Sequence, residues 1–234
     1  MLMSIPVFLL MLSLCILVHE YGHFFTAKRL GMPVLQLSIG MGPKLLHLGE
    51  LQGVPVYLRA IPIGGFVLFG KEFLEQPPTR KIAVILAGPA FSLAFGVLVP
   101  ILAGLTVGPA AVSAVWQAIV ASITDFFGLL APSQLSHFSA NTSSLIGVYH
   151  VSQPFISHGI KTTALFTGIF SINIGLMNLV PIPALDGGRI AVYLVEWLRG
   201  GKRLPLAVEG GLALAGIAVV LRIVCDGLVN DVFR

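Results

Sequence analysis

Residues 82–105 read IAVILAGPAFSLAFGVLVPILAGL and contain no ionisable side chain. A hydrocarbon core of about 30 Å needs roughly 20 apolar residues for one helical crossing, so this stretch can span a membrane as a single helix. The composition of the whole chain agrees, because 56% of its 234 residues are hydrophobic and only 10% are charged. Average soluble domains carry about 25% charged residues. The sequence therefore predicts a mainly α-helical integral membrane protein.

Three further stretches have the length and apolar character of membrane crossings. The fourth contains Glu209 and Arg222 near its ends, where side chains can reach the membrane interface. The first could instead be a cleavable signal peptide, but it lacks a basic start and a small-residue cleavage site. We expect one membrane-embedded domain over residues 1–234, with transmembrane segments at about 4–25, 82–105, 162–187 and 204–224.

The basic residues indicate how the segments are oriented. They gather in the connection between the first and second segments and in the connection before the fourth, namely at Lys28, Arg29, Lys44, Arg59, Lys71, Arg80, Lys81, Arg189, Arg199, Lys202 and Arg203. The connection between the second and third segments holds Lys161 alone. By the positive-inside rule, the first and third connections are cytoplasmic and both termini lie outside. No basic stripe with interleaved aromatics is visible, so no nucleic-acid partner is expected.

Two connections are expected to have structure of their own. Residues 33–70 are punctuated by Gly and Pro between short β-branched and aromatic runs, which predicts one or two β-hairpins at the cytoplasmic mouth. Residues 110–131 are apolar around Asp125. A fifth crossing there would place the two basic connections on opposite sides of the membrane, so we predict an interfacial or re-entrant helix on the outer face.

The first segment ends in His19-Glu20-Tyr21-Gly22-His23, an H-E-x-x-H motif. Side chains four residues apart share one face of a helix, so His19 and His23 can offer two imidazole nitrogens to one metal ion. Glu20 then has the position of the general base that activates water in zinc enzymes. Continuing the helix about 14 residues from Ile5 reaches His19 at a depth of about 21 Å. Ionisable groups at such depth usually mark function.

A catalytic zinc ion generally has three protein ligands and an open position for water, so one more ligand is needed. The only cysteines, Cys15 and Cys225, lie in apolar stretches and do not form a thiolate site. Asp186 is the favoured third ligand, because it lies at the inner end of the third segment, near the depth of the histidines. Pro181 and Pro183 interrupt the helix there, which is tolerated where the backbone lines a wet cavity. The other candidates are His47, Asp125, His137, His150 and His158.

HEYGH at residues 19–23 and NLVPIPALDGG at residues 178–188 resemble the paired signatures of the site-2 protease family of intramembrane zinc metalloproteases. Residues 61–66, IPIGGF, are similar to the family's β-hairpin, and AGP at 87–89 and IGV at 146–148 resemble its other motifs. The resemblance implies that His19, His23 and Asp186 bind Zn²⁺ and that Glu20 is the base. It also implies cleavage of transmembrane helices within a multi-pass protein of the inner (cytoplasmic) membrane, with the active site toward the cytoplasm.

The expected partners are the lipid bilayer and the transmembrane segment of a membrane-protein substrate, with anti-sigma factors and remnant signal peptides as candidates. Two features depart from the family pattern. Ser92 stands where relatives often have Asn, so a polar contact there is weakened or replaced. The connection between the second and third segments is too short for the PDZ domains of many bacterial relatives, which indicates a bacterial type without them.

Substrate binding is assigned to Asn178, which would help hold the substrate backbone, and to the strand around residues 61–69. Gly64, Gly65 and Phe66 on that strand would capture an unwound substrate by β-addition, unless the hairpin is purely structural. Two other functions are less consistent with the sequence. A metal-binding transporter would need more polar residues along its crossings than the second and third segments supply. A non-catalytic relative that binds helices would not need Glu20.

Overall fold

The computed structural model describes residues 4–129 and 144–233. The fold is mainly helical, and four of its helices are long and apolar enough to cross a membrane. These helices are α1 (Ser4–Arg29), α2 (Pro78–Val107), α6 (Ile160–Asn178) and α8 (Leu206–Phe233). They correspond to the four expected segments, although α8 continues beyond the predicted end at residue 224. The chain is therefore a multi-pass membrane protein.

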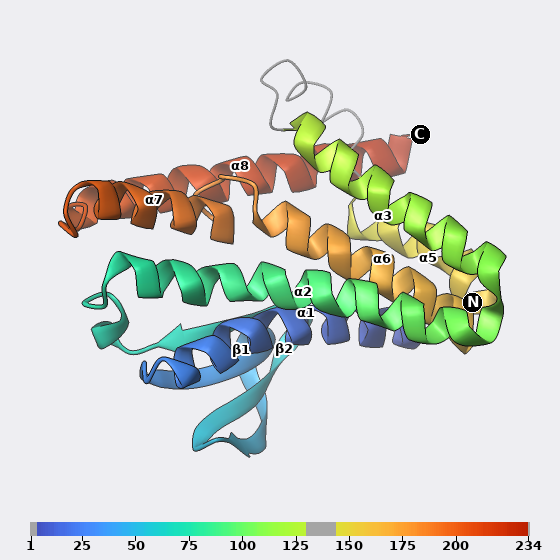
Figure 1. The fold of residues 1–234 in the computed structure, drawn as a ribbon, viewed down its shortest axis with the longest axis horizontal. Coiled ribbons are helices and arrows are strands. Elements are labelled where there is room, and N and C mark those ends of the chain that lie inside the picture. The colour runs from blue at the N-terminus through green and yellow to red at the C-terminus, as the bar shows by residue number, and fades with distance from the viewer. Residues whose placement is uncertain (1–3, 130–143, 234) are drawn as a thin grey trace.

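Helices α1, α2 and α6 lie side by side, with α2 packed against both α1 and α6 (Figure 1). Helices α1 and α6 run in the same direction, and α2 and α8 run in the opposite one, so the start of α1 and the end of α8 lie toward the same end of the molecule (Figure 1). Helices α1 and α2 touch at Gly22, where an added Cβ would be only 2.4 Å from the carbonyl oxygen of Ala87. Small residues allow such close approach between membrane helices. This contact brings the histidine face of α1 directly against α2.

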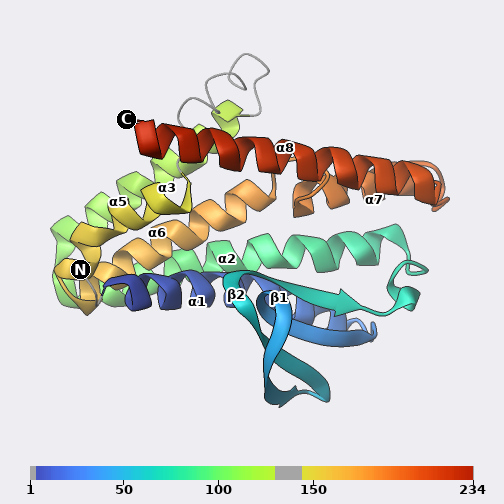
Figure 2. The same cartoon turned by 180° about the vertical axis from the view of Figure 1, so that it is seen from behind.

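A single long hairpin follows α1, where one or two were expected. Strands β1 (Val34–Leu51) and β2 (Val54–Phe69) pair antiparallel with several register shifts. Gln52 and Gly53 join them with positive φ angles of 52° and 74°, the backbone of a tight two-residue hairpin turn. The hairpin projects from the α1 side of the helices (Figure 2). Its β2 strand runs back along α1, so that Gly65 lies beside Ile16 and Glu20 rather than beyond the end of α1.

The third expected segment, about 162–187, is not one helix. Helix α6 ends at Asn178, and Asp186 begins a separate helix, α7 (Asp186–Leu198). Pro181 and Pro183 lie in the connection, where their missing N–H groups and fixed φ angles prevent a continuous helix. The sequence predicted the interruption but not the helix that follows it.

A hydrophobic core forms where α1, α2, α7 and the base of the hairpin meet. Phe24 from α1, Val84 from α2 and Tyr193 from α7 are buried together there, next to Val34 and Val54 of the strands. These packed side chains hold the C-terminal part of α1 next to α7. The core therefore supports the part of the molecule in which the H-E-x-x-H motif lies.

Helix α3 (Pro109–Leu129) forms within the expected range of 110–131, whose last two residues lie outside the described part of the chain. Its Val115 and Ile119 pack against Leu165 and Ile172 of α6. Its placement at the membrane interface remains a prediction. Two smaller elements were not expected: a 3-10 turn, η1 (Lys71–Phe73), and helix α5 (Leu145–Ser157), which Ser144 caps through its side chain.

Candidate metal centre

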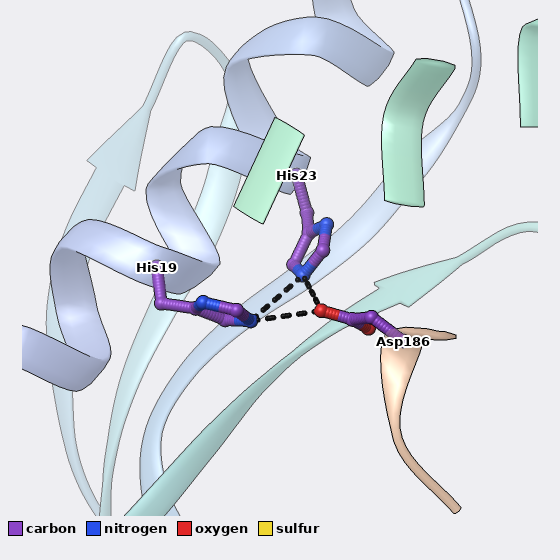
Figure 3. A group of neighbouring side chains, drawn as sticks. All are labelled: His19, His23 and Asp186. Carbon is purple, nitrogen blue, oxygen red and sulfur yellow. Dashed lines mark hydrogen bonds and ion pairs between the residues drawn. The ribbon is translucent and has the colours of Figure 1, made fainter. Parts of the chain in front are cut away.

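His19, His23 and Asp186 converge from two helices that are far apart in the sequence (Figure 3). The Nε2 atom of His19 lies 2.9 Å from Oδ2 of Asp186, and Nε2 of His23 lies 3.2 Å from the same oxygen. The two Nε2 atoms are 3.3 Å apart. All three residues are buried. Helix α1 supplies both histidines because they are one turn apart, and α7 supplies the carboxylate from its first residue.

This triangle of donor atoms fits a zinc ion. Zinc binds imidazole nitrogen and carboxylate oxygen at about 2.0–2.2 Å in a tetrahedral arrangement, which places neighbouring donor atoms about 3.4 Å apart. The distances here approach that value, and three donors leave the fourth position open. Within the described residues, this is the one group of three or more side chains whose ligand atoms lie close enough to share a metal ion.

The other candidate ligands lie elsewhere. The ring of His47 packs on Tyr57 in the hairpin, with centroids 5.1 Å apart. The ring of His150 packs on Tyr149, and His158 hydrogen-bonds the Pro154 carbonyl. Asp125 is exposed on α3, and His137 lies outside the described residues. Asp186 is thus the carboxylate that the structure brings to the histidine pair.

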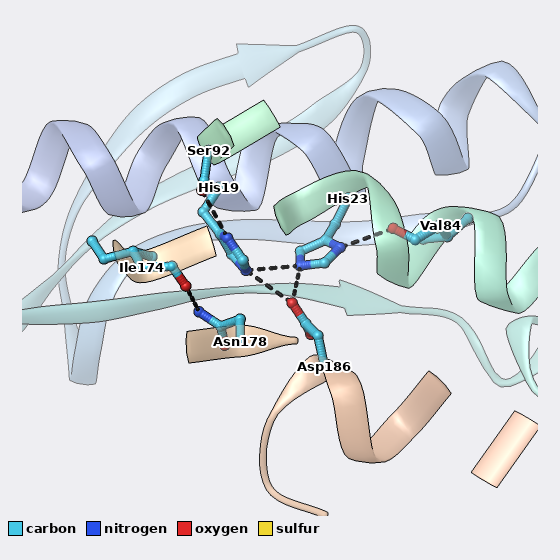
Figure 4. A network of polar contacts seen from close by, with 7 residues as sticks. All are labelled: His19, His23, Val84, Ser92, Ile174, Asn178 and Asp186. Carbon is cyan, nitrogen blue, oxygen red and sulfur yellow. Dashed lines mark hydrogen bonds and ion pairs between the residues drawn. The ribbon is translucent and has the colours of Figure 1, made fainter. Parts of the chain in front are cut away.

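Helix α2 fixes the orientation of both imidazole rings through contacts with their Nδ1 atoms (Figure 4). Nδ1–H of His23 donates to the carbonyl oxygen of Val84 at 2.9 Å, and Nδ1 of His19 lies 3.0 Å from Oγ of Ser92. Such contacts fix the ring orientation and leave Nε2 available to a metal ion. Ser92 therefore keeps a polar contact with the site at the position where relatives often have Asn. The Val84 contact was not predicted, because a backbone carbonyl carries no signal in the sequence.

Gly88 keeps the surface of α2 open beside the donor atoms. An added Cβ would lie 2.2 Å from Nε2 of His23 and 2.9 Å from Nε2 of His19. Any side chain at this position would occupy the space that a metal ion needs. Glycine is therefore needed in the Ala87-Gly88-Pro89 motif, because it allows α2 to contact the two imidazole rings without covering their Nε2 atoms.

Glu20 lies between the histidines and the hairpin. A Cβ added at Gly65 of β2 would be 3.0 Å from Cγ of Glu20, so the absence of a side chain at Gly65 makes room for the glutamate. Of the three hairpin residues assigned to substrate binding, Gly65 is the one shown to reach Glu20. Gly64 packs toward Met41 and has a φ angle of 79°, and the ring of Phe66 lies 4.7 Å from the guanidinium of Arg59.

Asn178 is the last residue of α6 (Figure 4). Its side-chain nitrogen donates to the carbonyl oxygen of Ile174 at 3.0 Å. In this arrangement the amide is held by its own helix. Contact with a substrate backbone would use the side-chain oxygen or follow rotation of the side chain, so its assigned role remains a prediction.

Comparisons with known proteins show similarity to zinc and membrane metalloproteases. The chain is 36% identical to zinc metalloprotease RasP of Shouchella clausii over 113 residues, which are 48% of this chain and 26% of that protein. It is 48% identical to the probable membrane metalloprotease ARASP2, chloroplastic, of Arabidopsis thaliana over 56 residues, 24% of this chain and 13% of that protein. These alignments cover less than a third of either relative. An alignment with a putative zinc metalloprotease of Fusobacterium nucleatum, 26% identical, covers 99% of both chains.

The family profile described as peptidase family M50 matches residues 7–223, nearly the whole chain. That range includes both His19 and Asp186, the two ends of the candidate metal centre. The chain therefore belongs to peptidase family M50, the site-2 protease family.

Proposed function

We propose that this protein is a zinc-dependent intramembrane endopeptidase that cleaves transmembrane helices of other membrane proteins. The observation that carries this proposal is the convergence of His19, His23 and Asp186, with Glu20 beside them, on helices of a membrane-spanning bundle. Buried ionisable groups at membrane depth cost free energy, so their presence favours a catalytic role over a structural one.

The chain's own residues have separate tasks in this proposal. His19, His23 and Asp186 would hold the metal, and Val84 and Ser92 would keep the two imidazole rings in place. When bound, zinc supplies a Lewis acid that polarises the scissile carbonyl and makes water a better nucleophile. The carboxylate of Glu20 takes a proton from the attacking water and returns it to the amide nitrogen of the leaving peptide.

The hairpin offers a way to hold an unwound substrate. A helical peptide bond is shielded by its own hydrogen bonds, so the substrate must lose local helix before it is cut. Within the described residues, the stretch of β2 from Gly65 to Phe69 pairs with the start of β1 on one edge, and no strand pairs with its other edge. A substrate segment added along β2 would replace its lost main-chain hydrogen bonds and pass beside Glu20 at Gly65.

Replacing Gly65 tests this arrangement. Gly65→Val is expected to lower kcat/KM for peptide cleavage by about tenfold or more, since a displacement of about 1 Å at a catalytic group can cost about 100-fold. The added side chain must displace Glu20, Ile16 or the Ser38 carbonyl, all near 3.0 Å from the new Cβ. Zinc content should not change. Gly210→Val is the matched control, because its Cβ would meet nothing within 4 Å. Unchanged cleavage by Gly65→Val would contradict the capture of substrate on β2.

The inner membrane and a cytoplasm-facing site belong to the same proposal. This orientation is supported by the basic residues of the connections between α1 and α2 and between α7 and α8, because such residues favour the cytoplasmic side. Substrates would then be single transmembrane segments, and anti-sigma factors and remnant signal peptides are the candidates. The open edge of β2 binds main chain rather than particular side chains, which suits a varied set of substrates.

Metal removal tests the proposed function directly. The purified chain in lipid nanodiscs is expected to cut a model transmembrane peptide, to lose this activity in a zinc chelator, and to regain it when Zn²⁺ is added back. Peptide cleavage and bound zinc are measured on the same samples. Cleavage that persists after the metal has been removed would refute the proposal. Zinc transport into liposomes without cleavage would favour a transporter, and substrate binding without cleavage a non-catalytic relative.

A further inference from the structure

A buried ion pair lies outside the metal centre and has no part in the chemistry proposed above. Nζ of Lys81, in the first turn of α2, lies 2.5 Å from Oε2 of Glu196, near the end of α7. Both side chains are only 1% exposed. The Lys81 ammonium also lies 4.4 Å from the ring centroid of Tyr193. The second oxygen of Glu196, Oε1, has no hydrogen-bond partner among the described residues.

Stability alone does not account for this pair. Removing two charges from water costs more than their attraction commonly returns, and a well-packed apolar pair of similar volume is often at least as stable. An ion pair differs from apolar packing in that it requires one relative placement of its two groups. Lys81 and Glu196 therefore define how α7 sits on α2.

Helix α7 carries the metal ligand at its opposite end. Asp186 is its first residue, and Glu196 lies about 15 Å further along at 1.5 Å per residue. Helices α2 and α7 run in opposite directions, so the start of α2 lies beside the end of α7 (Figure 1). A shift or rotation of α7 at Glu196 would therefore move Asp186 relative to the histidines.

Helix α2 is the common support of all three metal ligands. It holds His23 through the carbonyl of Val84 and His19 through Ser92. Val84 lies about one helical turn after Lys81. Lys81 in turn pairs with Glu196 of α7, the helix that supplies Asp186. The connection before α7, residues 179–185, contains two prolines and is not helical, so α6 does not impose the orientation of α7 through a continuous helix.

We propose that Lys81 and Glu196 are positioning residues, which set the placement of α7 on α2 and thereby hold Oδ2 of Asp186 against the Nε2 atoms of His19 and His23. This inference rests on the zinc site proposed above. It predicts that loss of the ion pair alters metal binding at a distance, even where the folded structure survives.

The test uses the full chain in lipid nanodiscs, with Co²⁺ as a spectroscopic probe of the metal site. The double variant Lys81→Met/Glu196→Met is expected to unfold at the wild-type temperature but to bind Co²⁺ about tenfold or more weakly, as is typical when groups that support metal ligands are removed. Its visible spectrum should shift toward that of Asp186→Ala, which lacks the third ligand. The charge swap Lys81→Glu/Glu196→Lys should recover much of the wild-type affinity.

The ion pair between Arg222 and Asp226 provides the control, since Arg222→Met/Asp226→Met also removes one cation and one carboxylate, but from a pair that lies within α8 and does not join α7 to α2. A folded double variant of Lys81 and Glu196 with wild-type affinity and spectrum would overturn the proposal. If that variant does not fold, Glu196→Gln decides, and wild-type Co²⁺ binding by folded Glu196→Gln overturns it as well. If the wild type shows no spectrum that depends on Asp186, the zinc site itself fails.

Discussion

Glu20→Gln is expected to abolish peptide cleavage while the protein keeps its zinc. The amide has nearly the shape of the carboxylate but cannot take a proton from water, and general acid and base groups contribute about 10²- to 10⁴-fold to rates. The three side chains that would hold the metal are unchanged, so zinc content should equal that of the wild type. Cleavage of a model transmembrane peptide and zinc stoichiometry, measured on the same nanodisc preparation, check both parts.

Glu75→Gln is the control for this prediction, because Glu75 is exposed in the connection between the hairpin and α2. It should cut as the wild type does. If Glu20→Gln cuts at the wild-type rate, Glu20 is not the base and the proposed mechanism is wrong. If the wild type also fails to cut while both hold zinc, a non-catalytic role replaces the proposed enzyme.

Asp186→Ala is expected to lose both zinc and activity. The change removes the carboxylate whose oxygen lies within metal-sharing distance of both histidines and leaves two ligands where catalytic zinc generally has three. Removing a group that merely supports a ligand costs about 10- to 100-fold in metal affinity, so loss of the ligand itself should cost more. Zinc affinity by competition with a chelator, measured beside the cleavage rate, checks the prediction.

Asp226→Ala on α8 is the matched control, because Asp226 forms an ion pair with Arg222 of the same helix and is not among the described side chains that could share a metal ion. Retention of wild-type zinc affinity by Asp186→Ala would show that the third ligand lies elsewhere. Taken together, the two variants separate chemistry from metal binding: Glu20→Gln should be inactive with zinc, and Asp186→Ala inactive without it.

The sequence alone determined the features that depend on local composition and spacing. Uncharged runs such as residues 82–105 predicted the four long helices, because crossing a bilayer requires length and apolar side chains and little else. The H-E-x-x-H spacing predicted that His19 and His23 share a face, because helical periodicity follows from backbone geometry. The prolines at 181 and 183 predicted a break before Asp186. Helices α5 and α7 were missed, because they are too short to stand out as membrane crossings.

Only the tertiary structure decided how distant segments meet. The sequence made Asp186 a candidate, but its 2.9 Å approach to His19, 167 residues away, depends on how α7 packs on α2. The support of His23 by the Val84 carbonyl, the space at Gly65 for Glu20 and the Lys81–Glu196 pair have the same origin. The physical reason is that periodicity and spacing constrain each segment separately, whereas the separation of atoms on different segments depends on side-chain packing throughout the folded chain.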